Sequence, residues 1–102
     1  MTYEEFDQIF DARIAALRET GQTKGLKYTE ATGDRLANFK REAADLGLTP
    51  IQVWAVYFGK HLSAVKHFIK TGKNIGEDIC DTHIHDCVMY LLLLEGLIKE
   101  GR

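Results

Sequence analysis

The segment that most constrains the fold is a long, largely apolar stretch near the end of the sequence, residues 77–100. Its apolar side chains recur at the 3.6-residue spacing of an α-helix and cover more than half of the helix circumference. His83 interrupts this apolar arc, and Asp86 lies on its edge. A carboxylate on a face that is buried requires a charged or hydrogen-bonding partner. These two residues are therefore the first candidates for a functional site.

Length and charge restrict the class of protein. The chain has 102 residues, which predicts one domain, residues 1–102, and its hydrophobic fraction of 45% is enough for a small core. The net charge of −2 provides no positive field for the phosphates of a nucleic acid polymer, so no such partner is expected. The longest apolar run, residues 87–94, is far shorter than the roughly 20 residues of a membrane-spanning helix, so no membrane partner is expected.

Cysteine spacing and the N-terminal residues predict a cytoplasmic protein. Cys80 and Cys87 lie seven residues apart on one predicted helix, which places them about 10 Å apart along its axis. That separation is too great for a disulfide, so a reducing compartment is expected. Residues 1–7 are acidic and contain no apolar run, so they do not predict a signal peptide.

Capping signals predict an all-α fold, a four-helix bundle-like domain. Thr2 and Glu5 form a capping box at the start of the first helix. Thr49 and Gln52 form a second box around Pro50, a favoured residue in the first turn of a helix. The predicted helices span residues 2–19, 34–46, 50–70 and 77–100, with a glycine-punctuated loop at 20–33 and a turn at 71–76.

Helical spacing assigns an inward face to each predicted helix. The first helix has a narrow apolar stripe that includes one charged residue, Arg13, and the third has a broad stripe with His61 near its middle. On the fourth helix, Asp81 and His85 are expected to project away from the apolar arc. On the first two helices the apolar residues expected to face the interior are Phe6, Ile9, Phe10, Ile14, Leu17, Leu36, Phe39, Ala43 and Leu46.

His61, His83 and Asp86 form the sharpest set of candidate residues. The short connection at 71–76 predicts that the third and fourth helices are antiparallel neighbours. The three side chains are then expected to approach one another across that interface or across a dimer. One interpretation is a ligand or metal site in which Asp86 acts as an oxygen ligand or base. The other is a hydrogen-bonded His–Asp pair that fixes the packing of the helices, and the residues alone leave both open.

Weaker signals indicate further candidates, each with an ordinary structural alternative. Mg²⁺ binds through carboxylates and substrate phosphates, but acidic groups also occur on solvated helix faces and at helix N-termini. The acidic candidates are Glu42 with Asp45, and Glu77 with Asp78 and Asp81. The candidates for phosphate contacts are Arg35, Lys60, Lys24 and Lys27, and those for stacking on a base are Trp54, Tyr57 and Phe58. A zinc set of Cys80, His83 and Cys87 is less favoured because no paired ligand motif accompanies it.

Three segments of the chain match a family pattern in order and spacing. They are Tyr28 with Gly33-Asp34-Arg35-Leu36-Ala37-Asn38-Phe39-Lys40, then Leu48-Thr49-Pro50 with Val53-Trp54, Tyr57 and Lys60-His61-Leu62, and finally Asp86 with Tyr90-Leu91-Leu92-Leu93-Leu94. Over roughly residues 24–100 the chain resembles the phage and prophage nucleotide modification associated domain family. That family in turn resembles the MazG-like all-α NTP pyrophosphatases, which are Mg²⁺-dependent and oligomeric. These enzymes cleave nucleoside triphosphates to monophosphate and pyrophosphate with carboxylates on neighbouring helices.

The resemblance implies a set of site residues. It implies catalytic roles for Asp86, His61 and Lys60, ligand binding by Asp34, Arg35, Asn38, Lys60 and His61, and a Mg²⁺ ion held by Asp34 and Asp86. One departure concerns the carboxylates of the pyrophosphatases. Glu42-Ala43-Ala44-Asp45 provides an E-x-x-D pattern, whereas the chain contains no E-x-x-E pattern.

The function implied by the resemblance is nucleotide handling in the cytoplasm of a bacterial host. The expected activity is Mg²⁺-dependent pyrophosphohydrolysis of (d)NTPs. Two alternatives are a non-catalytic protein that binds or sequesters a nucleotide, and a structural helical module. A homo-oligomer is expected because the apolar arc of residues 77–100 is wider than one small domain buries.

Overall fold

The computed structural model describes residues 1–28, 33–74 and 76–101. Four α-helices and one short π-helical segment make up the described chain, and no strand occurs in those ranges. The elements are α1 (Tyr3–Tyr28), α2 (Ala37–Leu46), α3 (Pro50–Thr71), η1 (Cys80–Ile84) and α4 (His85–Glu100). The predicted all-α class with four helices is confirmed. No helix in the described ranges combines the length and the apolarity that crossing a membrane requires.

The predicted helix ends at Gly47 and Gly72 and the predicted start at Pro50 are confirmed. Thr49 accepts a hydrogen bond from the backbone N–H of Gln52, whose side chain accepts one from the backbone N–H of Thr49. Gly47 and Gly72 adopt left-handed backbone conformations with φ near 70°, which glycine reaches without steric cost. Capping chemistry therefore sets the lengths of α2 and α3.

Helix α1 is longer than the sequence predicts. Its capping box is present, because Glu5 N–H donates to Thr2 Oγ1 at 3.1 Å. The helix continues through Gly21 to Tyr28, so the predicted loop is wrong for residues 20–28. A glycine inside a helix costs only about 1 kcal/mol relative to alanine, which the neighbouring helix-forming residues offset. Residues 29–32 of the predicted loop lie outside the described residues, as do the side chains of Lys24 and Lys27.

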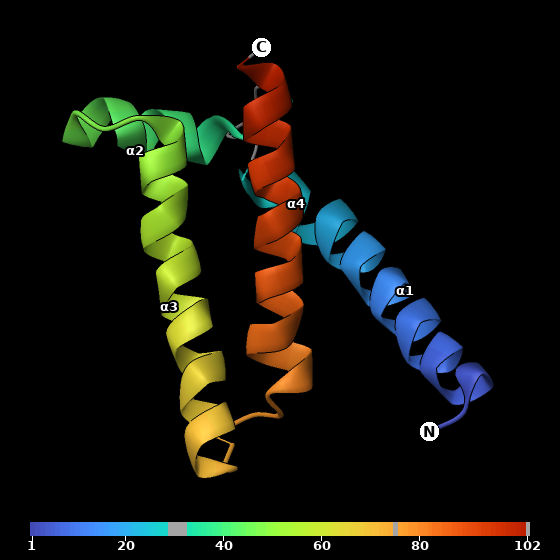
Figure 1. Ribbon diagram of the computed structural model, residues 1–102. Coiled ribbons are helices and arrows are strands. Elements are labelled where there is room, and N and C mark those ends of the chain that lie inside the picture. Colours follow the sequence, from blue (N-terminus) through green and yellow to red (C-terminus); the bar gives the residue numbers. More distant parts are fainter. Residues whose placement is uncertain (29–32, 75, 102) are drawn as a thin grey trace.

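The core lies where α2 crosses the first turns of α3 and the last turns of α4 (Figure 1). Phe39 of α2 is 2% exposed, and its ring meets those of Tyr57 and Tyr90 edge-on at centroid distances of 6.4 and 6.2 Å. Trp54 Nε1 donates to the backbone oxygen of Tyr90 at 2.6 Å, which ties α3 to α4. Leu46, expected inside, is 66% exposed because it ends α2 beyond this core.

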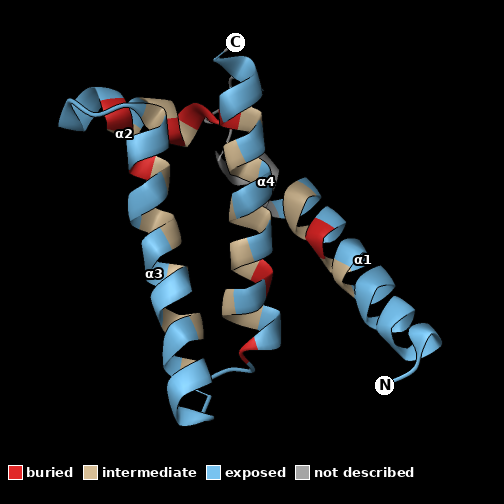
Figure 2. Cartoon of the chain, viewed as in Figure 1, coloured by how far each residue is buried: buried red, intermediate tan, exposed pale blue. Residues whose placement is uncertain are grey.

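Helices α3 and α4 run antiparallel side by side, whereas α1 leans away from them (Figure 1). Leu17 on the second half of α1 is buried, but Phe6, Ile9 and Phe10 near its start are each more than half exposed (Figure 2). The expected interior face of α1 is therefore corrected for its first half. The four helices do not close into a bundle within one chain.

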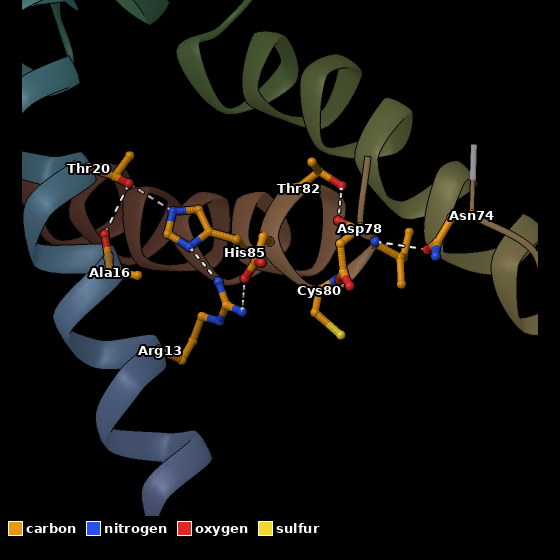
Figure 3. Close-up of polar contacts among 10 residues, drawn as sticks. Arg13, Ala16, Thr20, Asn74, Asp78, Cys80, Thr82 and His85 are labelled. Atoms are coloured by element: carbon orange, nitrogen blue, oxygen red, sulfur yellow. Dashed lines mark hydrogen bonds and ion pairs between the residues drawn. The ribbon is translucent and has the colours of Figure 1, made fainter. Parts of the chain in front are cut away.

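A group of polar contacts holds α1 against α4 and η1 (Figure 3). His85 is 7% exposed, and its Nδ1 lies 3.0 Å from Arg13 Nη1 while its Nε2 lies 2.9 Å from Thr20 Oγ1. Arg13 also contacts Asp81 at 2.9 Å. The expectation places His85 away from the apolar arc of α4, yet the residue is buried. The reason is that α1 extends past residue 19 and covers that side of α4.

The predicted fourth helix begins as a π-helical turn. Ile84 N–H donates to the oxygen of Ile79, five residues earlier, at 3.0 Å. Asp78 lies just before this turn and accepts from the backbone N–H of Cys80 at 2.7 Å (Figure 3). Single π-helical turns often occur at functional sites. Here the turn carries His83 and leads directly into Asp86.

Candidate functional site

The antiparallel packing of α3 and α4 brings His61, His83 and Asp86 together within one chain. His61 Nδ1 lies 3.2 Å from His83 Nδ1 and 3.5 Å from Asp86 Oδ2. One potential ligand atom from each of the three side chains lies within 4.8 Å of the other two. All three residues are partly buried. They form the group of nitrogen and oxygen ligands that the described part of the chain offers to a metal ion.

Burial keeps the imidazole of His61 neutral at neutral pH. Desolvation lowers the pKa of His61 below its ordinary value of 6.5, and the nearby His83 and Lys60 lower it further. The carboxylate of Asp86 acts in the opposite direction but does not outweigh the burial. The contact between His61 and Asp86 is therefore not an ion pair at neutral pH, and His61 keeps a lone pair available to a ligand.

A cavity of about 320 Å³ adjoins this cluster, between α2, α3 and α4. Its size is at the lower end of the range of small-molecule sites, roughly 300–1,000 Å³. It combines two guanidinium groups, two carboxylates, one amide and several aromatic rings. The lining residues are Thr20, Arg35, Asn38, Phe39, Arg41, Glu42, Tyr57, His61, Asp86, Met89, Tyr90 and Leu93.

Asn38 has a buried side-chain oxygen that lacks a hydrogen-bond donor among the described residues. This oxygen, Oδ1, is inaccessible to solvent. A buried oxygen without a donor costs about 1–3 kcal/mol. Other atoms of Asn38 line the cavity, so a ligand there would donate to this oxygen only after the amide group rotates toward it.

Tyr57 and Glu42 form a second polar pair in the cavity wall. The Tyr57 hydroxyl donates to Glu42 Oε2. This hydrogen bond to the carboxylate raises the pKa of Tyr57 above its ordinary value of 10.0, and burial raises it further. The phenol therefore remains protonated, and the pair orients one carboxylate oxygen inside the cavity.

Comparison with known proteins adds no family to these observations. No family model, curated protein or solved structure matches the chain. Function must therefore be inferred from the cavity and from the cluster of His61, His83 and Asp86.

Four of the residues implied by the resemblance lie on one cavity. They are Arg35, Asn38, His61 and Asp86. Lys60 is exposed on α3 and does not line this cavity. The structure therefore gathers most of the expected ligand-binding residues, although they come from three different parts of the chain.

Asp34 does not join Asp86, so the expected pair of metal-binding carboxylates is not formed. Asp34 Oδ2 accepts from Lys40 Nζ at 2.6 Å, and Lys40 also contacts Glu100 at the end of α4. Asp86 begins the same helix, about 21 Å from Glu100 at 1.5 Å per residue. Asp34 also accepts from the backbone N–H of Leu36, which starts α2. The Lys40 and Leu36 contacts lower the pKa of Asp34 below 3.8.

The remaining candidates are explained by local structure. Asp78 accepts from the backbone N–H of Cys80 at the start of the π-helical turn. Asp78, Glu77, Asp81 and Asp45 are all exposed. Trp54 and Phe58 pack edge-on at 4.8 Å, which indicates packing rather than base stacking. Cys80 and Cys87 are free thiols, as expected from their spacing.

Sequence reasoning missed the polar contact of His85 with Arg13 and Thr20. One signal was present in the sequence. Arg13 is the single charged residue in the apolar stripe of the first helix, and a guanidinium on a packed face requires an acceptor. The acceptor is His85, which no local pattern connects to residue 13.

Proposed function

We propose that the protein binds a nucleotide in the cavity between α2, α3 and α4. The observation that carries the proposal is the chemical composition of the cavity wall. Arg35 and Arg41 supply guanidinium groups, which pair with phosphate oxygens in a bidentate manner. Tyr57 and Tyr90 supply aromatic surface for a base. A nucleotide is the class of small molecule that presents both an anionic and a flat aromatic part.

Asn38 supports the same assignment. Its buried Oδ1 lacks a donor among the described residues. If the amide group rotates toward the cavity, this oxygen would accept a hydrogen bond from the exocyclic amino group of a base or from a sugar hydroxyl. The cavity therefore offers one recognition group to each of the three parts of a nucleotide.

Metal-dependent hydrolysis of the nucleotide is a second candidate function. The observation in its favour is that Asp86 and His61 line the same cavity as the guanidinium groups. Asp86 supplies a carboxylate for a divalent cation, and the phosphates of the substrate supply further oxygen ligands, as is usual for Mg²⁺. Such an enzyme would be the MazG-like (d)NTP pyrophosphohydrolase that the resemblance implies. The resemblance also implies that the protein is of phage type.

Self-association belongs to the same proposal. Phe6, Ile9 and Phe10 on α1 are more than half exposed, and so are Leu91 and Leu92 on α4. Exposed apolar residues that recur along a helix face mark association surfaces when they form a contiguous patch. We propose that the first half of α1 packs against a second copy of the chain.

Sedimentation of two variants tests this self-association. Phe10→Glu should shift the chain toward monomer, whereas Arg18→Glu, at an exposed position on the same helix, should not.

A thermal-shift panel of nucleotides tests the binding function. The expected result is a rise in melting temperature with at least one nucleotide, in the presence of a chelator as well as of Mg²⁺. Arg35→Ala and Asn38→Leu should abolish the rise. Arg18→Ala, which removes an exposed arginine that does not line the cavity, should retain it.

Product analysis of any nucleotide that binds separates the two functions. Release of pyrophosphate that is lost in Asp86→Asn supports the hydrolase. Binding without turnover supports a protein that sequesters the nucleotide. The absence of any shift across the panel rejects the nucleotide proposal and favours a structural helical module.

A further inference from the structure

We infer that His61, His83 and Asp86 form a binding site for a zinc-like divalent transition metal ion. The three side chains come from α3, η1 and the first turn of α4. They therefore stand on adjoining helices rather than on a loop, which fixes their positions before an ion arrives. This site does not depend on the nucleotide, because all of its ligands belong to the chain.

Two of the three distances in the cluster match those of a tetrahedral zinc site. With zinc–ligand bonds of about 2.0–2.1 Å, two ligands of a tetrahedron lie roughly 3.3 Å apart. The separation of the two Nδ1 atoms is 3.2 Å, and that of His61 Nδ1 and Asp86 Oδ2 is 3.5 Å. The remaining pair of ligand atoms lies within 4.8 Å. A small rotation of one side chain would complete the tetrahedral spacing.

Hydrogen bonding accounts for the contact of His61 with His83 but not for that of His61 with Asp86. At 3.5 Å, His61 and Asp86 are farther apart than the 2.7–3.2 Å of an N–H···O hydrogen bond. The short contact joins Nδ1 to Nδ1, so at most one of these nitrogens donates to the other. When the proton of each ring is on Nε2, the lone pairs of both Nδ1 atoms and of the carboxylate converge on one point, where a cation would stabilise all three groups.

The ligand types select the class of metal. Two imidazole nitrogens and one carboxylate oxygen are typical of zinc and of other first-row transition metals, whereas Mg²⁺ prefers oxygen ligands alone. Three protein ligands leave a fourth position open. Because His61 and Asp86 also line the cavity, an ion held by them would lie at the cavity wall, within reach of an oxygen atom of a bound ligand.

Titration of the full chain with Zn²⁺ in the absence of nucleotide tests the site. The chain is first stripped with a chelator, and Zn²⁺ and Mg²⁺ are then titrated by calorimetry. We expect one Zn²⁺ per chain and no measurable Mg²⁺ binding at the same concentrations. His83→Gln and the isosteric Asp86→Asn should each weaken Zn²⁺ binding roughly tenfold or more. The control His67→Gln, which removes an exposed histidine of α3, should bind as the unmodified chain does.

The cysteines provide a second control, because Cys80, His83 and Cys87 are a competing zinc set. The double variant Cys80→Ser with Cys87→Ser should retain the affinity for Zn²⁺. With Co²⁺ as a probe, visible bands of a four-coordinate ion are expected without the near-ultraviolet band of a thiolate ligand. Equal Zn²⁺ affinity in His83→Gln and His67→Gln overturns the inference, and so does loss of binding in the cysteine variant. Nucleotide binding measured with chelator present is independent of these results.

Discussion

Arg13 on α1 donates a hydrogen bond from Nη1 to Nδ1 of His85 on α4 across 3.0 Å. A guanidinium group has no acceptor, so this contact fixes Nδ1 of His85 as the accepting nitrogen. The proton of the neutral ring then lies on Nε2, which donates to Thr20 Oγ1. The Thr20 hydroxyl in turn donates to the oxygen of Ala16. Each group in this series therefore acts as a defined donor or acceptor, and the series begins and ends on α1.

Replacing Arg13 is expected to release α1 from α4. In Arg13→Met, Nδ1 of the buried His85 loses its donor, which costs about 1–3 kcal/mol. The amides of α1 should then exchange with deuterium faster, while those of α2 and α3 change little. Arg18→Met serves as the control because Arg18 is exposed on the same helix. Equal exchange of α1 in both variants would show that Arg13 does not anchor the helix.

Phe39 is expected to be the most sensitive core position. Its ring is 2% exposed and contacts the rings of Tyr57 and Tyr90. Phe39→Ala should lower the free energy of unfolding by about 3–5 kcal/mol. Phe10→Ala, at a site that is 55% exposed, should change it by about 0.5 kcal/mol or less at protein concentrations that favour the monomer. Urea titrations of both variants measure the difference, and similar losses would place the core elsewhere.

Asn38 and Asn74 are expected to respond to leucine in opposite directions. Asn38→Leu removes a buried oxygen that lacks a donor in the described chain, so the free energy of unfolding should rise by about 1 kcal/mol. Asn74→Leu removes the acceptor of the Ile79 N–H, so it should fall by about 1 kcal/mol. Thermal unfolding of the two variants without ligand makes the comparison. A loss of stability in Asn38→Leu as large as that in Asn74→Leu would mean that Asn38 is satisfied in the free protein.

The contacts of Asp34 with Lys40 and Leu36 should make the free energy of unfolding depend on pH in the acid range. Because the pKa of Asp34 is lowered on folding, the folded state binds the proton less readily than the unfolded state. The stabilising contribution is therefore present above the ordinary pKa of 3.8 and is lost as the pH falls through the lower folded value. At neutral pH, Asp34→Asn should cost about 1 kcal/mol, since the pair is partly exposed.

Unfolding free energies at pH 7 and in acid measure this effect. The difference in unfolding free energy between the unmodified chain and Asp34→Asn should become smaller as the pH falls. Asp45→Asn is the matched control, because Asp45 is exposed at the other end of α2. A gap that is the same at both pH values would contradict the role of the carboxylate charge.

The elements that local chemistry specifies were predictable from the sequence. The capping box of Thr49 and Gln52 placed the start of α3, and Gly47 and Gly72 placed the ends of α2 and α3. The buried face of α2 also followed from spacing, as Phe39 shows. These features depend on residues within one or two helical turns of each other.

The features that depend on distant contacts were not predictable in the same way. Gly21 indicated the end of a helix, but α1 continues to Tyr28. Thr20, next to this glycine, contacts His85 on α4, and the sequence pattern did not reveal that contact. The resemblance implied a metal-binding role for Asp34, and helical spacing alone did not reveal its ion pair with Lys40. The approach of His61 to Asp86 was foreseen because it follows from the antiparallel pairing of two neighbouring helices.

Thr20 and Asp86 each line both the cavity between α2, α3 and α4 and a second cavity beside α1. Thr20 is also one of the residues that fasten α1 to His85. A molecule that contacts Thr20 from within the first cavity therefore contacts one of the residues that hold α1 against α4. Occupancy of the cavity and docking of α1 are then coupled equilibria, and the coupling acts equally in both directions. If the molecule favours the contact of Thr20 with His85, tighter docking of α1 raises its affinity, and its binding stabilises the docked helix by the same free energy.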